Sequence, residues 1–134
     1  MTTTTETKTI QITMSERRPL KINPEHWPII ARADRHDGKI EFQANRVWRI
    51  IVRQHADGRR LVYGWLGRGN GGMPIDWRGA AGGFVVEPAR RISTEPSFPN
   101  DDATIRAIRR IGGIIEDEQL AADCIADLPA EELT

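Results

Sequence analysis

The sequence contains only one cysteine, Cys124, in 134 residues. A single cysteine cannot form a disulfide within its own chain, so nothing in the composition points to an oxidising compartment. The chain starts Met-Thr-Thr-Thr-Thr-Glu, without the apolar segment of a secretion signal, and no apolar run approaches the roughly 20 residues that span a membrane. We therefore expect a cytoplasmic protein that does not engage a membrane.

Metal-binding and catalytic patterns are also missing. His26, His36 and His55 stand alone, and neither a His-x-x-x-His nor a Cys-x-x-Cys spacing occurs, whereas a zinc site needs three or four converging ligands. No serine lies in a nucleophile elbow, and Cys124 falls on the apolar stripe of a predicted helix, where a buried inert thiol is expected. We therefore expect no metal, no cofactor and no catalytic residue, and a protein that is not an enzyme.

One motif matches in its letters but not in its context. Residues 67–72 read Gly-Arg-Gly-Asn-Gly-Gly, which fits G-x-G-x-x-G, but a dinucleotide site needs a helix that begins directly after the glycines. Pro74 and further glycines follow instead. We interpret residues 67–82 as a long loop, in which Arg68 could contact an anion and Trp77 could anchor a partner.

The chain does have the size and composition of one folded domain. Hydrophobic residues make up 39% of the sequence and charged residues 28%, which is typical of a globular protein. A core of this size needs no covalent staple. We expect residues 1–14 to form a flexible extension or an edge strand, and residues 15–134 to form a single domain.

Charge is divided along the chain although the net charge is zero. Residues 15–99 carry 15 Lys and Arg against 9 Asp and Glu, a balance of +6, and residues 100–134 carry 3 against 9, a balance of −6. From Glu116 onward there are seven acids and no base. Either the acidic C-terminal part packs on the basic body, or the two parts face different partners.

The strongest structural pattern is a β-hairpin at residues 47–66. Residues 46–55 are rich in Val, Ile and Trp, Asp57-Gly58 suits a tight turn, and residues 59–66 return as a second strand. A two-residue turn at 57–58 would place Val52 opposite Tyr63. Under this register one face of the hairpin is apolar and contains Trp48, Ile50, Val52, Leu61, Tyr63 and Trp65.

The opposite face of this predicted hairpin would bring together Arg49, Arg53 and Arg60. Arginines grouped in this way could contact the phosphates of a nucleic acid or the carboxylates of a protein partner. Aliphatic side chains would share the face with them, which favours a third arrangement, in which the acidic C-terminal helix covers the arginines.

Shorter patterns add strands on both sides of the hairpin. Alternating or β-branched segments predict strands at residues 8–13, 29–35, 39–43 and 84–86, with a turn at residues 23–28 and another at Asp37-Gly38.

Two helices are predicted at the C-terminal end. Ile105, Ile108 and Ile111 recur at helical spacing, and we expect Gly112-Gly113 to end this helix. A second helix begins at the acids 116–118, and its apolar stripe consists of Leu120, Cys124 and Leu128. The predicted fold is therefore α+β: an antiparallel sheet of four to five strands, a meander with the hairpin at 47–66, packed by the two C-terminal helices.

Two segments resemble known proteins. The run FQANRVWRIIVRQHADGRRLVYG at residues 42–64, together with CIADLPAEEL at residues 124–133, resembles small accessory proteins of bacterial mobile elements. In size and in the lack of a catalytic motif, the chain is also similar to phage and plasmid inhibitors such as anti-CRISPR and anti-restriction proteins. The resemblance implies a protein that occludes the nucleic-acid site of a partner, often with an acidic surface, and it assigns no functional residue.

We therefore expect a non-enzymatic binding protein of bacterial or phage origin that binds or inhibits a protein machine. The candidate contact residues lie at the acidic helix start and in the glycine-rich segment: Glu116, Asp117, Glu118, Arg68 and Trp77. The alternative is a nucleic-acid-binding regulator that uses Arg49, Arg53 and Arg60. An enzyme with a pocket built from loops is the third hypothesis.

Overall fold

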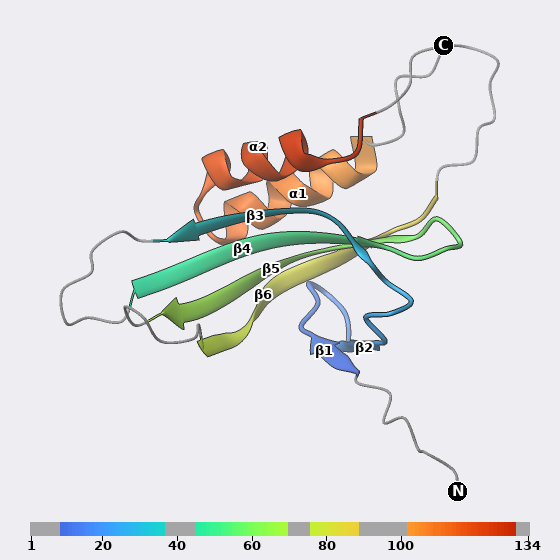
Figure 1. Ribbon diagram of the computed structural model, residues 1–134, viewed down its shortest axis with the longest axis horizontal. Coiled ribbons are helices and arrows are strands. Elements are labelled where there is room, and N and C mark those ends of the chain that lie inside the picture. Colours follow the sequence, from blue (N-terminus) through green and yellow to red (C-terminus); the bar gives the residue numbers. More distant parts are fainter. Residues whose placement is uncertain (1–8, 37–44, 70–75, 89–101, 131–134) are drawn as a thin grey trace, which may run out of the picture.

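The computed structural model of the protein describes residues 9–36, 45–69, 76–88 and 102–130. Its main element is a four-stranded antiparallel sheet in the order β3-β4-β5-β6, formed by β3 (Ile29–His36), β4 (Asn45–Gln54), β5 (Arg60–Gly69) and β6 (Asp76–Val86). The helices α1 (Asp102–Ile114) and α2 (Glu118–Asp127) cover one face of this sheet (Figure 1). The predicted α+β class, with an antiparallel sheet packed by two C-terminal helices, is confirmed.

A small second sheet lies on the other face. Strands β1 (Ile10–Ile12) and β2 (Leu20–Ile22) pair antiparallel and pack below the main sheet, so the molecule has three layers (Figure 1). Ile12 and Met14 are buried there beside Tyr63 of β5. A strand was predicted at residues 8–13, and β1 occupies the middle of that segment.

The hairpin forms, but in a different register from the predicted one. His55 donates its backbone N–H to the carbonyl of Arg59 (2.9 Å), so the turn is the three-residue loop 56–58 and Val52 lies opposite Val62. Gly58 has a φ of +93°, the left-handed conformation that ends this type of three-residue loop. The extra turn residue shifts β5 by one position and exchanges its two faces.

Each face of the sheet therefore packs in its own hydrophobic core, and neither core has the residues of the predicted apolar face. Toward the helices, Ile50 and Val52 of β4 pack with Val62 of β5 and with apolar residues of α1 and α2. Toward β1 and β2, the core is formed by Ile12, Met14, Ile22, Ile51, Leu61 and Tyr63. The prediction that Leu61, Tyr63 and Trp65 share a face with Trp48, Ile50 and Val52 is wrong.

The glycine-rich stretch 67–82, predicted as a long loop, is mostly strand. β5 continues to Gly69 and β6 begins at Asp76, which leaves residues 70–75 between them. At the end of this stretch glycine serves as a spacer: a Cβ added to Gly82 would lie 2.7 Å from Ser15 Oγ, and one added to the next residue, Gly83, would lie 3.0 Å from Met14 Sδ. Because the Met14–Ser15 segment crosses β6 this closely, the strand needs residues without side chains.

The first helix also runs past its predicted end. α1 includes Gly112 and Gly113 and ends at Ile114. A Cβ on Gly112 would lie 2.7 Å from Ala121 Cβ, so this glycine allows α1 and α2 to approach closely. The second helix is confirmed, with Asp117 as its N-cap and with Leu120 and Cys124 buried.

Other predictions have simpler outcomes. The turn at 23–28 and the strand at 29–35 are confirmed. The turn at Asp37-Gly38 and the strand at 39–43 lie outside the described residues. Within the part of the chain that the structure describes, neither helix has the length and apolar character needed to cross a membrane.

Candidate functional site

The predicted arginine face is divided between the two sides of the sheet. Arg49 and Arg53 of β4 lie on the β1–β2 side, because they alternate with Ile50 and Val52, which face the helices. Arg60 of β5 lies on the helix side, in line with Val62. The prediction that Arg49, Arg53 and Arg60 share one face is wrong, and the one-residue register change is the physical reason.

Each of these arginines is held within the molecule. Arg49 Nε pairs with Asp34 Oδ1 on the neighbouring strand. Arg53 donates to the hydroxyl of Tyr63 and to the backbone carbonyl of Trp27, both at 2.9 Å. Arg60 donates to Gln54 Oε1 (3.0 Å) and to Thr104 Oγ1 (3.3 Å), so it ties the sheet to α1. Their donors serve mainly to hold strands, turn and helix together.

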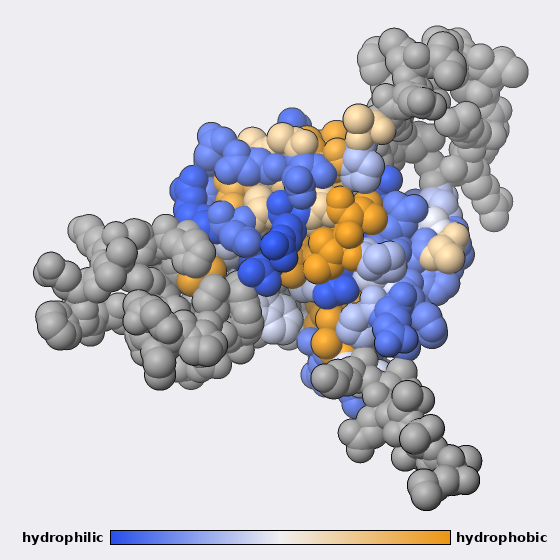
Figure 2. Space-filling model, viewed as in Figure 1, coloured by the Kyte–Doolittle hydropathy of each residue, from blue (hydrophilic) through white to orange (hydrophobic). Residues whose placement is uncertain are grey.

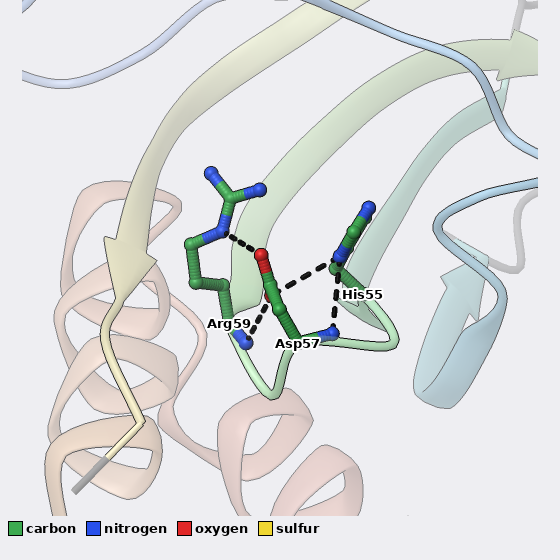
Figure 3. Close-up of polar contacts among 3 residues, drawn as sticks. All are labelled: His55, Asp57 and Arg59. Atoms are coloured by element: carbon green, nitrogen blue, oxygen red, sulfur yellow. Dashed lines mark hydrogen bonds and ion pairs between the residues drawn. The ribbon is translucent and has the colours of Figure 1, made fainter.

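The β4–β5 turn forms a compact polar group (Figure 3). His55 Nδ1 accepts the backbone N–H of Asp57 (3.1 Å), and Arg59 Nε donates to Asp57 Oδ2 (2.7 Å). The hydrogen bond from the backbone N–H of Arg59 is the main cause that lowers the pKa of Asp57; desolvation opposes it, and the Arg59 guanidinium lowers the pKa further. Trp27 covers the group, with its ring 5.0 Å from His55 and 5.2 Å from the Arg59 guanidinium.

A groove of about 920 Å³ lies at this end of the sheet. Its walls come from the turn before β3, the start of β3, the β4–β5 turn with the adjoining strand ends, and the segment after α2, and they include His26, Ile30, His55, Arg60 and Pro129. Figure 2 shows a hydrophobic strip beside the C-terminal end of α2. Ile29, at the start of β3, is 41% exposed. Among the described residues, no three His, Cys, Asp or Glu side chains converge as metal ligands, and no buried polar side-chain atom lacks a partner.

The outer surface of α2 is acidic. Glu116, Glu118, Asp123 and Asp127 are exposed along the helix and the turn before it, and the helix carries no base. Between them lie the small exposed residues Ala122 and Ala126, and this surface is largely hydrophilic in Figure 2. In the part of the chain that the structure describes, neither Glu116 nor Glu118 has an ion-pair partner.

Asp117, the third acid of the predicted contact cluster, has a structural role. Its carboxylate accepts the backbone N–H of Leu120 (3.0 Å) and pairs with Arg35 Nε of β3 (3.1 Å), and its side chain is only 9% exposed. At the other end of α2, Asp127 accepts the backbone N–H of Arg32 (2.9 Å) and so covers an outer position of β3. These two contacts fix α2 over the edge of the sheet.

The last two predicted contact residues, Arg68 and Trp77, lie at the far end of the sheet. Arg68 pairs with Asp76 in the β5–β6 ladder, and Trp77 pairs with Gly67. The structure therefore brings Arg68 and Trp77 to neighbouring positions of the ladder, at the end of β5 and the start of β6.

A second groove was not foreseen from the sequence. It measures about 550 Å³, lies between β6 and α1, and is lined by Phe84, Val85, Val86, Glu87, Ala103, Arg106, Ala107 and Arg110. The Arg110 guanidinium lies 4.5 Å from the centre of the Phe84 ring. The helical spacing of Arg106 and Arg110 was visible in the sequence, but their position beside an edge strand depends on the packing of α1.

Comparison of the chain with protein-family models, with curated proteins and with solved structures finds no match. Function must therefore be inferred from the surfaces described above.

Proposed function

We propose that this chain is a cytoplasmic, non-enzymatic binding protein of the kind carried by bacterial and phage mobile elements, and that it binds or inhibits a protein or protein–nucleic-acid machine through the acidic face of α2. The observation that carries the proposal is the cluster of exposed acids at Glu116, Glu118, Asp123 and Asp127, on a helix without a base.

The chemistry of this surface indicates the class of partner. Asp123 and Asp127 are one helical turn apart, about 6 Å along the axis, and the alanines beside them allow a partner to come close. Lys and Arg side chains suit such a row of carboxylates, with bidentate pairing available to Arg. A basic surface of the type that holds a nucleic acid therefore fits as the partner, and occupying it would inhibit the machine.

Five arginines of the sheet and the β4–β5 turn support the same choice. Arg35, Arg49, Arg53, Arg59 and Arg60 all make contacts inside the molecule. No observation on the described residues favours the nucleic-acid alternative, since the arginines proposed for it lie on different faces and are already engaged.

The experiment is affinity capture from a nuclease-treated bacterial lysate, read by quantitative mass spectrometry. The test variant is Glu118→Lys with Asp123→Lys, which leaves the Asp117 cap intact. The control is Glu16→Lys with Glu25→Lys, since these two acids are exposed and their reversal changes the net charge equally. We expect the wild-type and control proteins to enrich the same partner and the test variant to lose it.

Circular dichroism and a thermal melt should show that both variants are folded. Equal capture by the test variant and the wild type would remove the acidic face of α2 as the contact surface. If the wild type enriches no protein, the binding function itself is contradicted.

A further inference from the structure

The outer edge of β6 has backbone groups directed away from the sheet. The carbonyl of Gly83 accepts a hydrogen bond from the backbone N–H of Ser15 (2.9 Å), so the backbone N–H and C=O of Gly83 point away from β5. The direction of the backbone N–H and C=O alternates from one residue to the next in an antiparallel ladder. The N–H and C=O of Val85, two residues along, therefore also point away from β5. The pairing of β4 with β5 leads to the same orientation. His55 and Arg59 form a hydrogen-bonded pair, so the backbone N–H and C=O of Leu61, two residues after Arg59, point toward β4. Val85 lies opposite Leu61 and therefore receives no hydrogen bond from it.

The groove of about 550 Å³ lies immediately beside this edge. Phe84 and Val86 form its apolar side on β6, and Ala103 and Ala107 form the facing side on α1. Arg106 and Arg110 line it from α1, and Glu87 is its acid at the end of β6. An outward-facing position of β6 that has no backbone partner among the described residues, an apolar floor and nearby arginines are therefore gathered in one place.

We propose that this groove binds an extended peptide with acidic side chains, which adds to the sheet as a fifth strand beside β6. The N–H and C=O of Val85 would pair with the peptide backbone, as in other complexes formed by strand addition. Every second peptide side chain would enter the groove, where apolar groups meet Phe84 and an acidic group meets Arg110. Glu87 would repel a second acid at its own end and so set the direction of the peptide.

This surface is separate from the one in the proposed function. α1 packs on β5 and β6, whereas α2 packs mainly on β3 (Figure 1). The groove prefers an acidic ligand and the face of α2 prefers a basic one, so the chain could connect two partners. If the experiment on one surface contradicts its proposal, the proposal for the other surface is unaffected.

The test is selection of random dodecapeptides by phage display on the full-length protein, followed by fluorescence anisotropy on the best peptide. We expect the selected peptides to alternate apolar residues with Asp or Glu. Arg110→Glu should weaken binding by about tenfold or more, because a charge pair becomes a repulsion. The matched control is Arg109→Glu, which makes the same charge change on an exposed residue of α1 that does not line the groove, and it should bind as the wild type does.

The strand addition has its own test. Val85→Pro removes the outward N–H, and should weaken binding by about three- to tenfold, the value of one hydrogen bond. If this variant does not fold, N-methylation of alternate peptide residues tests the same hydrogen bonds on the unaltered protein.

Three results would overturn the proposal. The first is failure to select any peptide. The second is a set of peptides without acids, or with equal affinity for Arg110→Glu and Arg109→Glu. The third is concentration-dependent dimerisation in sedimentation that Val85→Pro abolishes, which would assign the edge to a second copy of the chain.

Discussion

At the residue scale, two neighbouring glycines of α1 have opposite surroundings. A Cβ on Gly112 would lie 2.7 Å from Ala121 Cβ and 3.2 Å from the Asp117 carbonyl, whereas a Cβ on Gly113 would have no atom within 4 Å. Glycine in a helix costs about 1 kcal/mol relative to alanine, so each position gives up local stability and only Gly112 recovers it through packing.

This pair gives a matched prediction. Gly112→Ala should lower the free energy of unfolding by about 1–3 kcal/mol, because α2 must move away from α1. Gly113→Ala should raise it by about 0.5 kcal/mol, because only the intrinsic propensity changes. Urea denaturation of the two variants measures both values, and equal effects of the same sign would show that the α1–α2 contact is looser than described.

Cys124 is the second informative residue. Its side chain is fully buried, with Sγ 3.9 Å from the carbonyl oxygen of Ile50. Burial, with a smaller contribution from Asp127, raises the pKa of the thiol from 9.0 to about 12. This agrees with the expectation of an inert thiol, since the thiolate is the reactive form.

The raised pKa predicts slow modification of the Cys124 thiol in the folded protein and a stability that falls as the pH rises. At pH 8 the thiolate fraction should be about a thousandfold lower in the folded than in the unfolded protein, so a disulfide reagent should modify Cys124 rapidly only in denaturant. Above pH 9 the unfolded thiol loses its proton first, so stability should fall as pH rises from 9 toward 12. Urea curves of the wild type and of Cys124→Ala over this range isolate the effect, and parallel pH dependence would contradict it.

At the scale of elements, the β4–β5 hairpin shows how one turn residue decides two faces. Asp57-Gly58 was correctly identified as the turn, and the strands on both sides follow from their Val, Ile and Trp content. The loop nevertheless has three residues, since Gly58 takes the left-handed position that closes a three-residue loop rather than the second position of a tight two-residue turn. Both loops suit this dipeptide, so the sequence around it could not choose between the two registers.

α2 depends on Asp117 for its position. Asp117→Ala removes both the cap on Leu120 and the pair with Arg35, and should lower the free energy of unfolding by about 1–2 kcal/mol. Asp117→Asn keeps an oxygen that can cap the helix and loses only the ion pair, which is partly exposed, so its effect should stay below about 1 kcal/mol. Chemical denaturation distinguishes them, and an Asn variant as unstable as the Ala variant would contradict the capping role.

At the scale of the whole molecule, the charge division seen in the sequence becomes a division of surfaces. Part of the acidic C-terminal region does pack back on the basic body, through Asp117 with Arg35 and through Asp127 with the backbone of Arg32. Glu116, Glu118 and Asp123 remain exposed. Both arrangements considered for the tail are therefore present in one helix and the turn before it.

The engaged arginines give a whole-molecule prediction about nucleic acid. Mobility-shift assays at low salt with duplex or single-stranded DNA should show no complex at protein concentrations up to about 10 μM, because Arg49, Arg53 and Arg60 are engaged inside the molecule and do not form one basic face. A complex that weakens steeply with added salt would reinstate the nucleic-acid alternative, and Arg106→Glu with Arg109→Glu would then test whether α1 forms it.

The class of the fold follows from the amino-acid sequence alone, because hydrophobic periodicity and turn residues are local properties that do not depend on how the elements are arranged. The strands around the hairpin, the two C-terminal helices and the buried Cys124 all follow from such patterns. Which face each side chain occupies depends on tertiary packing, since the register depends on one turn residue. Packing also places residues 67–69 and 76–82 in strands and Gly112 in a helix. A Cβ added to Gly82 or Gly112 would lie 2.7 Å from a neighbouring atom, so glycine is required at these two positions although it is typical of a breaker in sequence. The proposed sites depend on these decisions: α2 is acidic in sequence, but its exposure and the groove beside β6 exist only in the packed molecule.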